Sequence, residues 1–264
     1  MPRVLAVIAA LGLTLALLAH PASGEARETS TTPSPTIRDA AAPVTGRARI
    51  VDSAAVVEGI DVSHHQGRID WARVASAGKR FAYVRASAGT LTADRTYRAN
   101  RSRALAAGLT VGSYHFANPS AAPGDAAAEA AWFLRNATIA SGDLRPVLDL
   151  EVANGLPATA LFTWAQTWLT AVERATGVKP LIYTTPKFWI RSMANAEWFA
   201  RNGYALWVAH WTSAERPFVP ASTWAGEGWA LWQTSSTGSV PGISGRVDLD
   251  RFAGATLTSE VLVP

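Results

Sequence analysis

The segment Pro146-Val147-Leu148-Asp149-Leu150-Glu151 joins a short apolar run to two carboxylic acids. Its apolar residues predict a buried β-strand, and seven similar runs occur elsewhere in the chain. Stretches with helical spacing separate the early runs, which is typical of parallel βα units. The eight expected strands lie at residues 59–63, 81–86, 110–116, 146–151, 180–184, 205–211, 230–233 and 246–249.

Helical spacing is clearest over residues 160–176. There Trp164 and Trp168 fall on one face. Thr159 is the expected N-cap and Gly177 the expected left-handed stop. Eight strands with helices outside them predict an α/β fold, a TIM-like barrel whose last helices are degenerate. The other expected helices lie at residues 71–77, 95–107, 125–136 and 188–201.

An export signal is predicted at the amino terminus. Arg3 precedes an apolar run over residues 4–18, and the small residues Ala22 and Gly24 follow it. This order is typical of a secretory signal peptide cleaved after Gly24. A membrane anchor is the alternative, but the run is shorter than the ~20 residues that span a bilayer. We therefore expect residues 1–24 to be removed and the mature protein to be extracellular, with no membrane association.

A linker is expected to follow the signal peptide. Residues 25–57 are rich in Ser, Thr, Pro, Ala and Arg and have no apolar period, which predicts a disordered leader. The first aromatic residue of the chain is Trp71, so the capacity to build a core begins near that point. A single barrel domain is therefore expected over residues 58–264.

Composition excludes several classes of protein. The 264 residues include 24 Lys and Arg, 20 Asp and Glu, 48% hydrophobic residues and no cysteine. These values exclude a disulfide-rich miniprotein, a collagen-like chain and a wholly disordered chain. The expected domain keeps 19 basic and 16 acidic residues, and no basic run is interleaved with aromatic residues. We therefore expect no nucleic acid partner.

Four acidic residues are candidates for chemistry because of where they fall along the expected strands. Asp61 lies at the end of the first strand, Asp149 and Glu151 at the end of the fourth, and Asp248 within the eighth. In barrels of this kind the reactive groups sit at the carboxyl ends of the strands. A solvated turn is the alternative for an isolated Asp-x-Glu. Four converging carboxylates are difficult to explain on structural grounds alone.

The spacing of Asp149 and Glu151 points to a specific reaction. Residues i and i+2 of a strand face the same side, with Cα atoms about 6–7 Å apart. Like charges that close resist joint ionisation, so one carboxyl keeps its proton to higher pH and can act as a general acid. Carboxyl pairs of this kind cleave glycosidic bonds.

Aromatic residues near strand ends provide a second indication. Trp211 can stack on the apolar face of a sugar ring, and the hydroxyls of Tyr114 and Tyr183 can bond to sugar oxygens. For His115 and His210 a core position and a substrate contact are equally compatible with the sequence. We expect no metal, because the histidines lack ligand spacing and the chain has no cysteine.

Seven short segments have an order that is specific when they are taken together. They are 59–67 (GIDVSHHQG), 112–116 (GSYHF), 148–151 (LDLE), 181–184 (LIYT), 206–211 (LWVAHW), 231–233 (LWQ) and 247–252 (VDLDRF). Together they resemble glycoside hydrolase family 25, the secreted lysozymes that cleave peptidoglycan at N-acetylmuramic acid. The resemblance implies a barrel of (β/α)5(β)3 type, with eight strands and fewer than eight helices.

The resemblance also implies roles for individual residues. Glu151 is implied as the general acid/base, and Asp149 as the adjacent carboxylate that stabilises or orients the reacting sugar. Asp61 and Asp248 are implied as further acids of the cleft. The expected substrate-binding residues are Tyr114, Tyr183, His210, Trp211 and Gln233.

The same resemblance implies the reaction and the partner. The reaction is hydrolysis of the β-1,4 bond between N-acetylmuramic acid and N-acetylglucosamine, and the partner is a glycan strand of peptidoglycan. A monomer without cofactor or metal is expected. This chain departs from many relatives at Ala88, where they carry an acidic residue in the turn after the second strand.

Two other functions remain as alternatives, and a third is excluded. A chitinase-like glycosidase uses a strand-end Asp-x-Asp-x-Glu run, but Val147 occupies the first position here. A non-catalytic barrel that binds cell walls would keep the aromatic residues and lose the acids. A deacetylase requires His and Asp at metal-binding spacing, which is absent. Two carboxyls on one strand are closer than the ~6.5–9.5 Å of inverting enzymes, which favours retention or participation by the substrate acetamido group.

Overall fold

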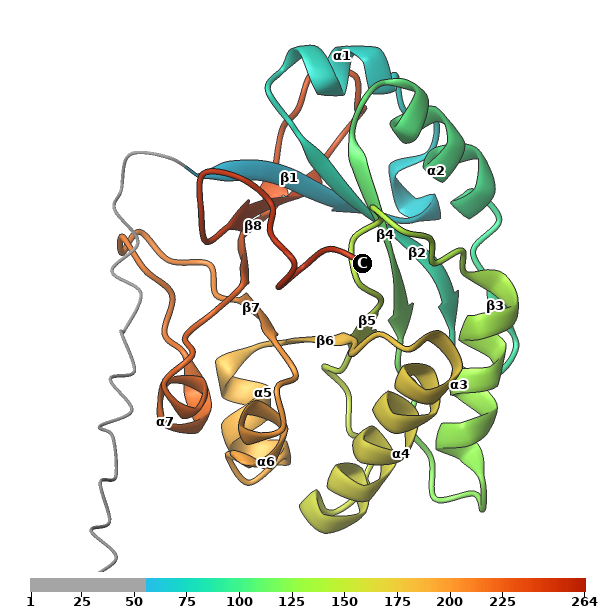
Figure 1. Ribbon diagram of the computed structural model, residues 1–264, viewed down its shortest axis with the longest axis vertical. Helices are drawn as coiled ribbons and strands as arrows, with labels where there is room; N and C mark the ends of the chain where they lie inside the picture. Colours follow the sequence, from blue (N-terminus) through green and yellow to red (C-terminus); the bar gives the residue numbers. More distant parts are fainter. Residues whose placement is uncertain (1–55) are drawn as a thin grey trace, which may run out of the picture. The chain divides into compact units, whose positions relative to one another are not determined.

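The computed structural model describes residues 56–264 and shows a closed barrel with helices outside it (Figure 1). The expected signal peptide and most of the expected linker lie outside the described residues. Eight strands form the barrel in the order β1-β9-β8-β7-β6-β5-β4-β2, and pairing of β1 with β2 closes it. The barrel strands are β1 (Val57–Val62), β2 (Phe81–Ala88), β4 (Thr110–Phe116), β5 (Val147–Asp149), β6 (Leu181–Thr184), β7 (Leu206–Ala209), β8 (Leu231–Gly238) and β9 (Val247–Phe252). The predicted TIM-like barrel of eight strands is confirmed.

One strand of the barrel runs against the others. The other seven barrel strands, β1, β2 and β4 to β8, pair in parallel, whereas β9 is antiparallel to both β1 and β8. Only residues 239–246 join β8 to β9, and a parallel crossover needs a dozen residues or more. The short connection therefore forces an antiparallel return. As a result, the beginning of β9 lies at the edge where the other strands end.

Seven α-helices occur within residues 56–264, so the expectation of fewer than eight is confirmed for this part of the chain. Helices α3 and α4 pack side by side on one flank of the barrel (Figure 1). The short helices α5, α6 and α7 lie beside β6 and β7 (Figure 1). The helices are α1 (Trp71–Ser76), α2 (Tyr97–Ala106), α3 (Asp125–Asn136), α4 (Ala158–Thr176), α5 (Pro186–Ser192), α6 (Trp198–Arg201) and α7 (Pro220–Ala225).

Two helical expectations need correction. The single helix expected at 188–201 is two helices, because Ala194 and Asn195 adopt positive φ angles of 49° and 54° between them. Helix α4 has Pro157 as its N-cap residue instead of Thr159, and it begins two residues earlier than expected. Proline fixes φ in the helical range and leads directly into the helix. Gly177 ends α4 in the left-handed conformation, as predicted.

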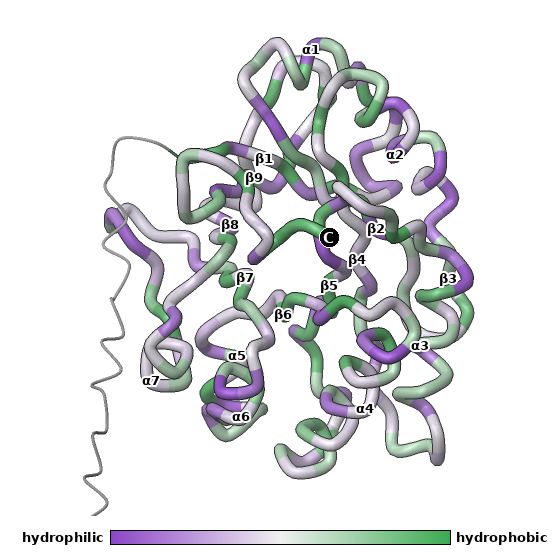
Figure 2. Tube along the Cα trace, viewed as in Figure 1, coloured by the Kyte–Doolittle hydropathy of each residue, from purple (hydrophilic) through white to green (hydrophobic). Residues whose placement is uncertain are grey.

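Two apolar clusters hold the barrel together. The larger lies between the strands and the helices and includes Trp168 and Trp189. The smaller fills the barrel itself, where Tyr83 stacks on Trp207 with ring centroids 4.7 Å apart. Gly112 faces this filling, and a Cβ atom there would lie 2.3 Å from the ring of Tyr83. Figure 2 shows hydrophobic residues along strands β6 and β7.

Candidate active site

A pocket of about 290 Å³ opens where the parallel strands end. It brings together residues from all eight barrel strands, including the start of β9. Eight of the nine predicted site residues line this pocket: Asp61, Tyr114, Asp149, Glu151, Tyr183, Trp211, Gln233 and Asp248.

Asp149 and Glu151 differ in their exposure to solvent. Strand β5 ends at Asp149, two residues earlier than expected, so Glu151 lies in the loop beyond it. Asp149 is 7% exposed, and within the described residues its Oδ1 has no hydrogen-bond partner. Glu151 is exposed. The main chain around the pair is fixed because Leu150 N donates to Tyr183 O at 2.9 Å.

The pKa values of both carboxyls are raised. For Asp149, burial and then the charge of Glu151 raise the pKa well above its usual range, while Arg85 acts in the opposite direction. For Glu151, desolvation against the pocket wall and then the charge of Asp248 raise the pKa. The pocket therefore favours the protonated form of each carboxyl more than water does.

Gln233 connects three predicted residues in one hydrogen-bond network. Its Oε1 accepts hydrogen bonds from the Tyr183 hydroxyl at 3.1 Å and from Trp211 Nε1 at 3.0 Å. Two donors on one side fix the orientation of the amide, so Nε2 faces Asp61 and donates to its Oδ2 at 2.7 Å. The network therefore fixes an acid, a hydroxyl and an aromatic ring relative to one another.

Asp250 belongs to the same acidic cluster, although the sequence analysis did not select it. It is buried and accepts a hydrogen bond from Trp207 Nε1 at 3.1 Å, while within the described residues its Oδ2 has no hydrogen-bond partner. Burial and the charge of Asp248 raise the pKa of Asp250 well above its usual range. Its position two residues after Asp248 was the available signal, because both face the same side of β9.

Arg85 places a permanent positive charge in the pocket wall, and sequence reasoning missed it as well. Its Nε donates to Asp94 Oδ2 at 3.2 Å, and its Nη2 lies 2.5 Å from Nδ1 of His64. Burial opposes ionisation of Asp94, but hydrogen bonds from Thr96 and His64 outweigh it and lower the pKa to about 2. Arg85 is thereby held beside Asp149.

Three residues singled out from the sequence lie elsewhere. His210 does not line the pocket, and its Nδ1 accepts a hydrogen bond from Phe218 N at 3.0 Å. His115 is a core residue, fully buried, with Nε2 2.8 Å from Glu129 Oε2. Ala88 is the last residue of β2 and pairs with Thr92, so it does not lie in the turn after the strand.

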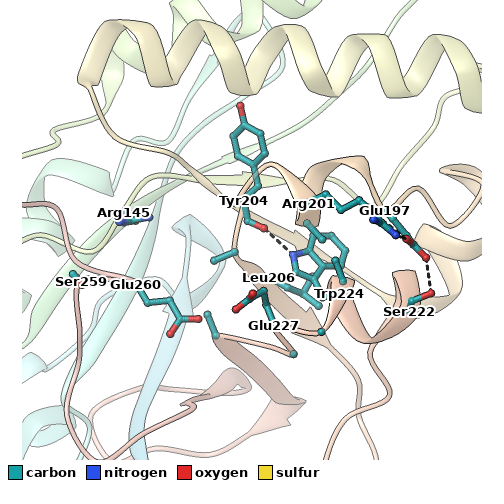
Figure 3. Close-up of a pocket in the computed structure, with 17 residues that line it drawn as sticks. Arg145, Glu197, Arg201, Tyr204, Leu206, Ser222, Trp224, Glu227, Ser259 and Glu260 are labelled. Atoms are coloured by element: carbon teal, nitrogen blue, oxygen red, sulfur yellow. Dashed lines mark hydrogen bonds and ion pairs between the residues drawn. The ribbon is translucent and has the colours of Figure 1, made fainter. Parts of the chain in front are cut away.

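A larger cavity lies at the opposite end of the barrel. This pocket of about 990 Å³ is lined by residues that precede or begin β5, β7 and β8. Figure 3 shows two hydrogen bonds here: the Ser222 hydroxyl donates to the carboxylate of Glu197, and the indole N–H of Trp224 donates to the main-chain oxygen of Tyr204. Glu197 is also paired with Arg201. None of the predicted site residues lines this pocket, so cavity size does not identify the candidate site.

Asp248 should make the stability of the fold depend on pH. Burial raises the pKa of Asp248 to about 6, so between about pH 4 and pH 6 the folded chain binds more protons than the unfolded chain. The free energy of unfolding therefore falls as the pH rises through this window. The shift corresponds to about 3 kcal/mol, which solvent screening reduces to about 1–2 kcal/mol. Asp248→Asn should recover that amount at pH 7 and little at pH 4, as measured by urea unfolding. An unchanged or steeper pH dependence in the variant would contradict this.

Two further features of residues 56–264 bear on function. No helix there is both long and apolar enough to cross a membrane. That same part of the chain has no group of three or more His, Cys, Asp or Glu side chains arranged to hold a metal ion.

Comparison with known sequences identifies relatives. Residues 60–243 match the model of glycosyl hydrolases family 25. The chain is 39% identical over 212 residues to lysozyme M1 of Streptomyces globisporus, covering 75% of this chain and 68% of that protein. It is 30% identical over 220 residues to N,O-diacetylmuramidase of Arthroderma benhamiae, covering 78% of this chain and 90% of that protein.

Comparison with solved structures agrees. The bacterial lysozyme from Streptomyces coelicolor matches with a TM-score of 0.70 and 37% identity, covering 77% of this chain and 94% of that one. A family GH25 lysozyme from Aspergillus fumigatus matches with a TM-score of 0.68 and 28% identity, covering 76% and 95%. The chain therefore belongs to glycosyl hydrolases family 25 and is a glycoside hydrolase.

Proposed function

We propose that the protein is a secreted lysozyme that hydrolyses the β-1,4 bond between N-acetylmuramic acid and N-acetylglucosamine in peptidoglycan. The observation that carries the proposal is the meeting of Asp149 and Glu151 with Asp61 and Asp248 in one pocket. Family membership and the lysozyme and muramidase names of the relatives support the choice of substrate.

In this proposal Glu151 is the proton donor. A general acid must reach the oxygen of the scissile bond, and Glu151 is the exposed member of the pair. Its raised pKa favours the protonated form, which the first step requires. Glu151 would protonate the leaving oxygen and then, as the conjugate base, accept a proton from the water that completes hydrolysis.

Asp149 is the proposed stabilising carboxylate. It is the more buried of the two, and burial alone would favour its neutral form. The positive charge of Arg85, held by Asp94, opposes this effect in part, because it favours the ionised form. A negative charge in a site that excludes water stabilises the positive charge that develops on the sugar. Retention, by Asp149 itself or by the substrate acetamido group, is the stereochemical outcome we propose.

Asp61 and Gln233 are proposed to set the geometry of the substrate-binding side chains. Gln233 fixes the hydroxyl of Tyr183 and the indole of Trp211 in place. Such fixed groups cost little entropy when a sugar binds. The hydroxyl of Tyr114, which lines the same pocket, is proposed to contact the substrate.

The boundaries of the catalytic domain lead to a simple test. Strand β1 begins at Val57, whose main-chain N donates to Gly254 O at 3.2 Å. Val57 therefore belongs to the barrel and not to the expected linker, and we propose that the signal peptide ends at Gly24 and that residues 25–53 make no contribution to the barrel. A chain that begins at Ala54 should unfold cooperatively and lyse cell walls at the same rate as the chain from Glu25. Thermal unfolding and turbidity assays measure both properties. Loss of cooperative unfolding in the shorter chain would place the boundary further upstream.

Parallel digestion of purified peptidoglycan and of chitin tests the proposed function. Release of soluble fragments from peptidoglycan, and much less from chitin, is the expected result. Preferential release from chitin would favour the chitinase-like alternative. Binding to peptidoglycan without release of fragments would favour the non-catalytic alternative.

A further inference from the structure

A second groove adjoins the catalytic pocket. It measures about 450 Å³ and is formed by the segment after β6 and the segment after β7. Trp211 lines both the groove and the pocket, so the two spaces meet at its ring. Among the residues that line the groove, only Lys187 carries a permanent charge, whereas several acidic side chains line the pocket. The remaining lining includes Pro186, Ile190 and Phe218.

The apolar side chains of this groove are unusually open to water. Trp211 is 57% exposed, Phe218 is 55% exposed and Ile190 is 43% exposed. These three are half of the six large hydrophobic residues that are exposed within residues 56–264. Exposed apolar residues that lie together, unlike single ones, mark a binding surface.

Hydrogen bonds hold this surface in shape. Trp211 Nε1 donates to Gln233 Oε1 at 3.0 Å, and Phe218 N donates to Nδ1 of His210 at 3.0 Å. His210 is itself fixed, because its main-chain oxygen accepts from Trp232 Nε1 at 2.8 Å. The ring of Trp211 and the main chain at Phe218 are therefore positioned before any ligand arrives, which lowers the entropy lost on binding.

The chemistry of the groove favours a sugar ring over a peptide. A peptide stem would bring amide groups against Pro186, Ile190 and Phe218, which offer no side-chain hydrogen-bond partners, and burying unpaired amides is costly. A sugar ring presents C–H groups to an aromatic face and keeps its hydroxyls in water.

We propose that this groove binds an N-acetylhexosamine ring of the same glycan strand, next to the sugars held in the catalytic pocket. The proposal rests on the proposed lysozyme function and extends it, because it assigns Phe218 and Ile190 to substrate recognition. It also gives His210 a role as a positioning residue for Phe218.

The variant Phe218→Ser tests the proposal on peptide-free glycan strands of two lengths. On the long strand kcat/KM should fall about 3- to 10-fold through a higher KM, with a much smaller change on a strand too short to reach the groove. Leu105→Ser is the matched control, because Leu105 is 40% exposed on helix α2 and lines none of these spaces. Melting temperatures of both variants should match the parent.

Each other outcome would overturn the assignment. An equal loss on both strands would place Phe218 within the catalytic pocket, and no loss would leave the groove without a role in binding. A loss seen only when peptide stems are attached would identify a peptide as the occupant. If the parent cleaves neither strand, the lysozyme proposal fails. The groove can still be tested by calorimetry, which measures the affinity of the long strand for the parent and for Phe218→Ser. Equal affinities would overturn the inference.

Discussion

Glu151→Gln should lower kcat/KM on peptidoglycan by about 10²- to 10⁴-fold, the usual contribution of general acid catalysis. Glutamine keeps the size of the side chain but cannot give up a proton to the leaving sugar. An aryl glycoside with a good leaving group needs little protonation, so its bond-breaking step should be largely spared. The comparison of the two substrates therefore isolates proton donation from binding.

The Glu151→Gln experiment has a clear control. Glu151 is exposed at the pocket, so the variant should melt like the parent or slightly higher, because one of several crowded charges is gone. An equal loss on both substrates at unchanged melting temperature would show that Glu151 is not the proton donor.

Asp149→Asn should impair catalysis in a different way. Removal of the negative charge beside the developing cation should slow both substrates, by about 10²- to 10³-fold if the effect matches the loss of one preorganised electrostatic contact. The need for this negative charge does not depend on the leaving group. Rates with peptidoglycan and with the aryl glycoside, each at saturating substrate, measure it.

The two variants together assign the roles. If Asp149→Asn spared the activated substrate while Glu151→Gln slowed both, the proton donor would be Asp149 and the stabilising carboxylate Glu151. The buried position of Asp149 makes this exchange a real alternative, since burial alone would keep Asp149 protonated. Asp149→Asn should also preserve or raise the melting temperature, because it removes a buried charge.

The periodicity of the apolar residues predicted most of the fold. Apolar runs of strand length located all eight barrel strands, and the ranges of β4 and α3 agree with the expected residues 110–116 and 125–136. Sequence periodicity reports which face is buried, not which direction a strand runs. The reversal of β9 was therefore invisible to that pattern, although the short connection after Gly238 contained the information.

Some residues of the site were predicted from the sequence and others were missed, for a similar physical reason. Asp61, Asp149 and Glu151 could be found because parallel strands carry their functional groups to one end. Asp248 was selected from its strand and lies at the same end only because β9 is reversed. Arg85 was missed because a single arginine in a strand has no local pattern, and only the pairing of distant residues places it beside Asp149.

The identity of the new reducing ends in digested peptidoglycan tests the central claim most directly. Purified peptidoglycan would be digested, reduced with borohydride and analysed by mass spectrometry. We expect reduced N-acetylmuramic acid at the new ends with the parent protein, and almost none with Glu151→Gln. Reduced N-acetylglucosamine at the new ends, or muramic acid ends formed equally well by Glu151→Gln, would contradict it.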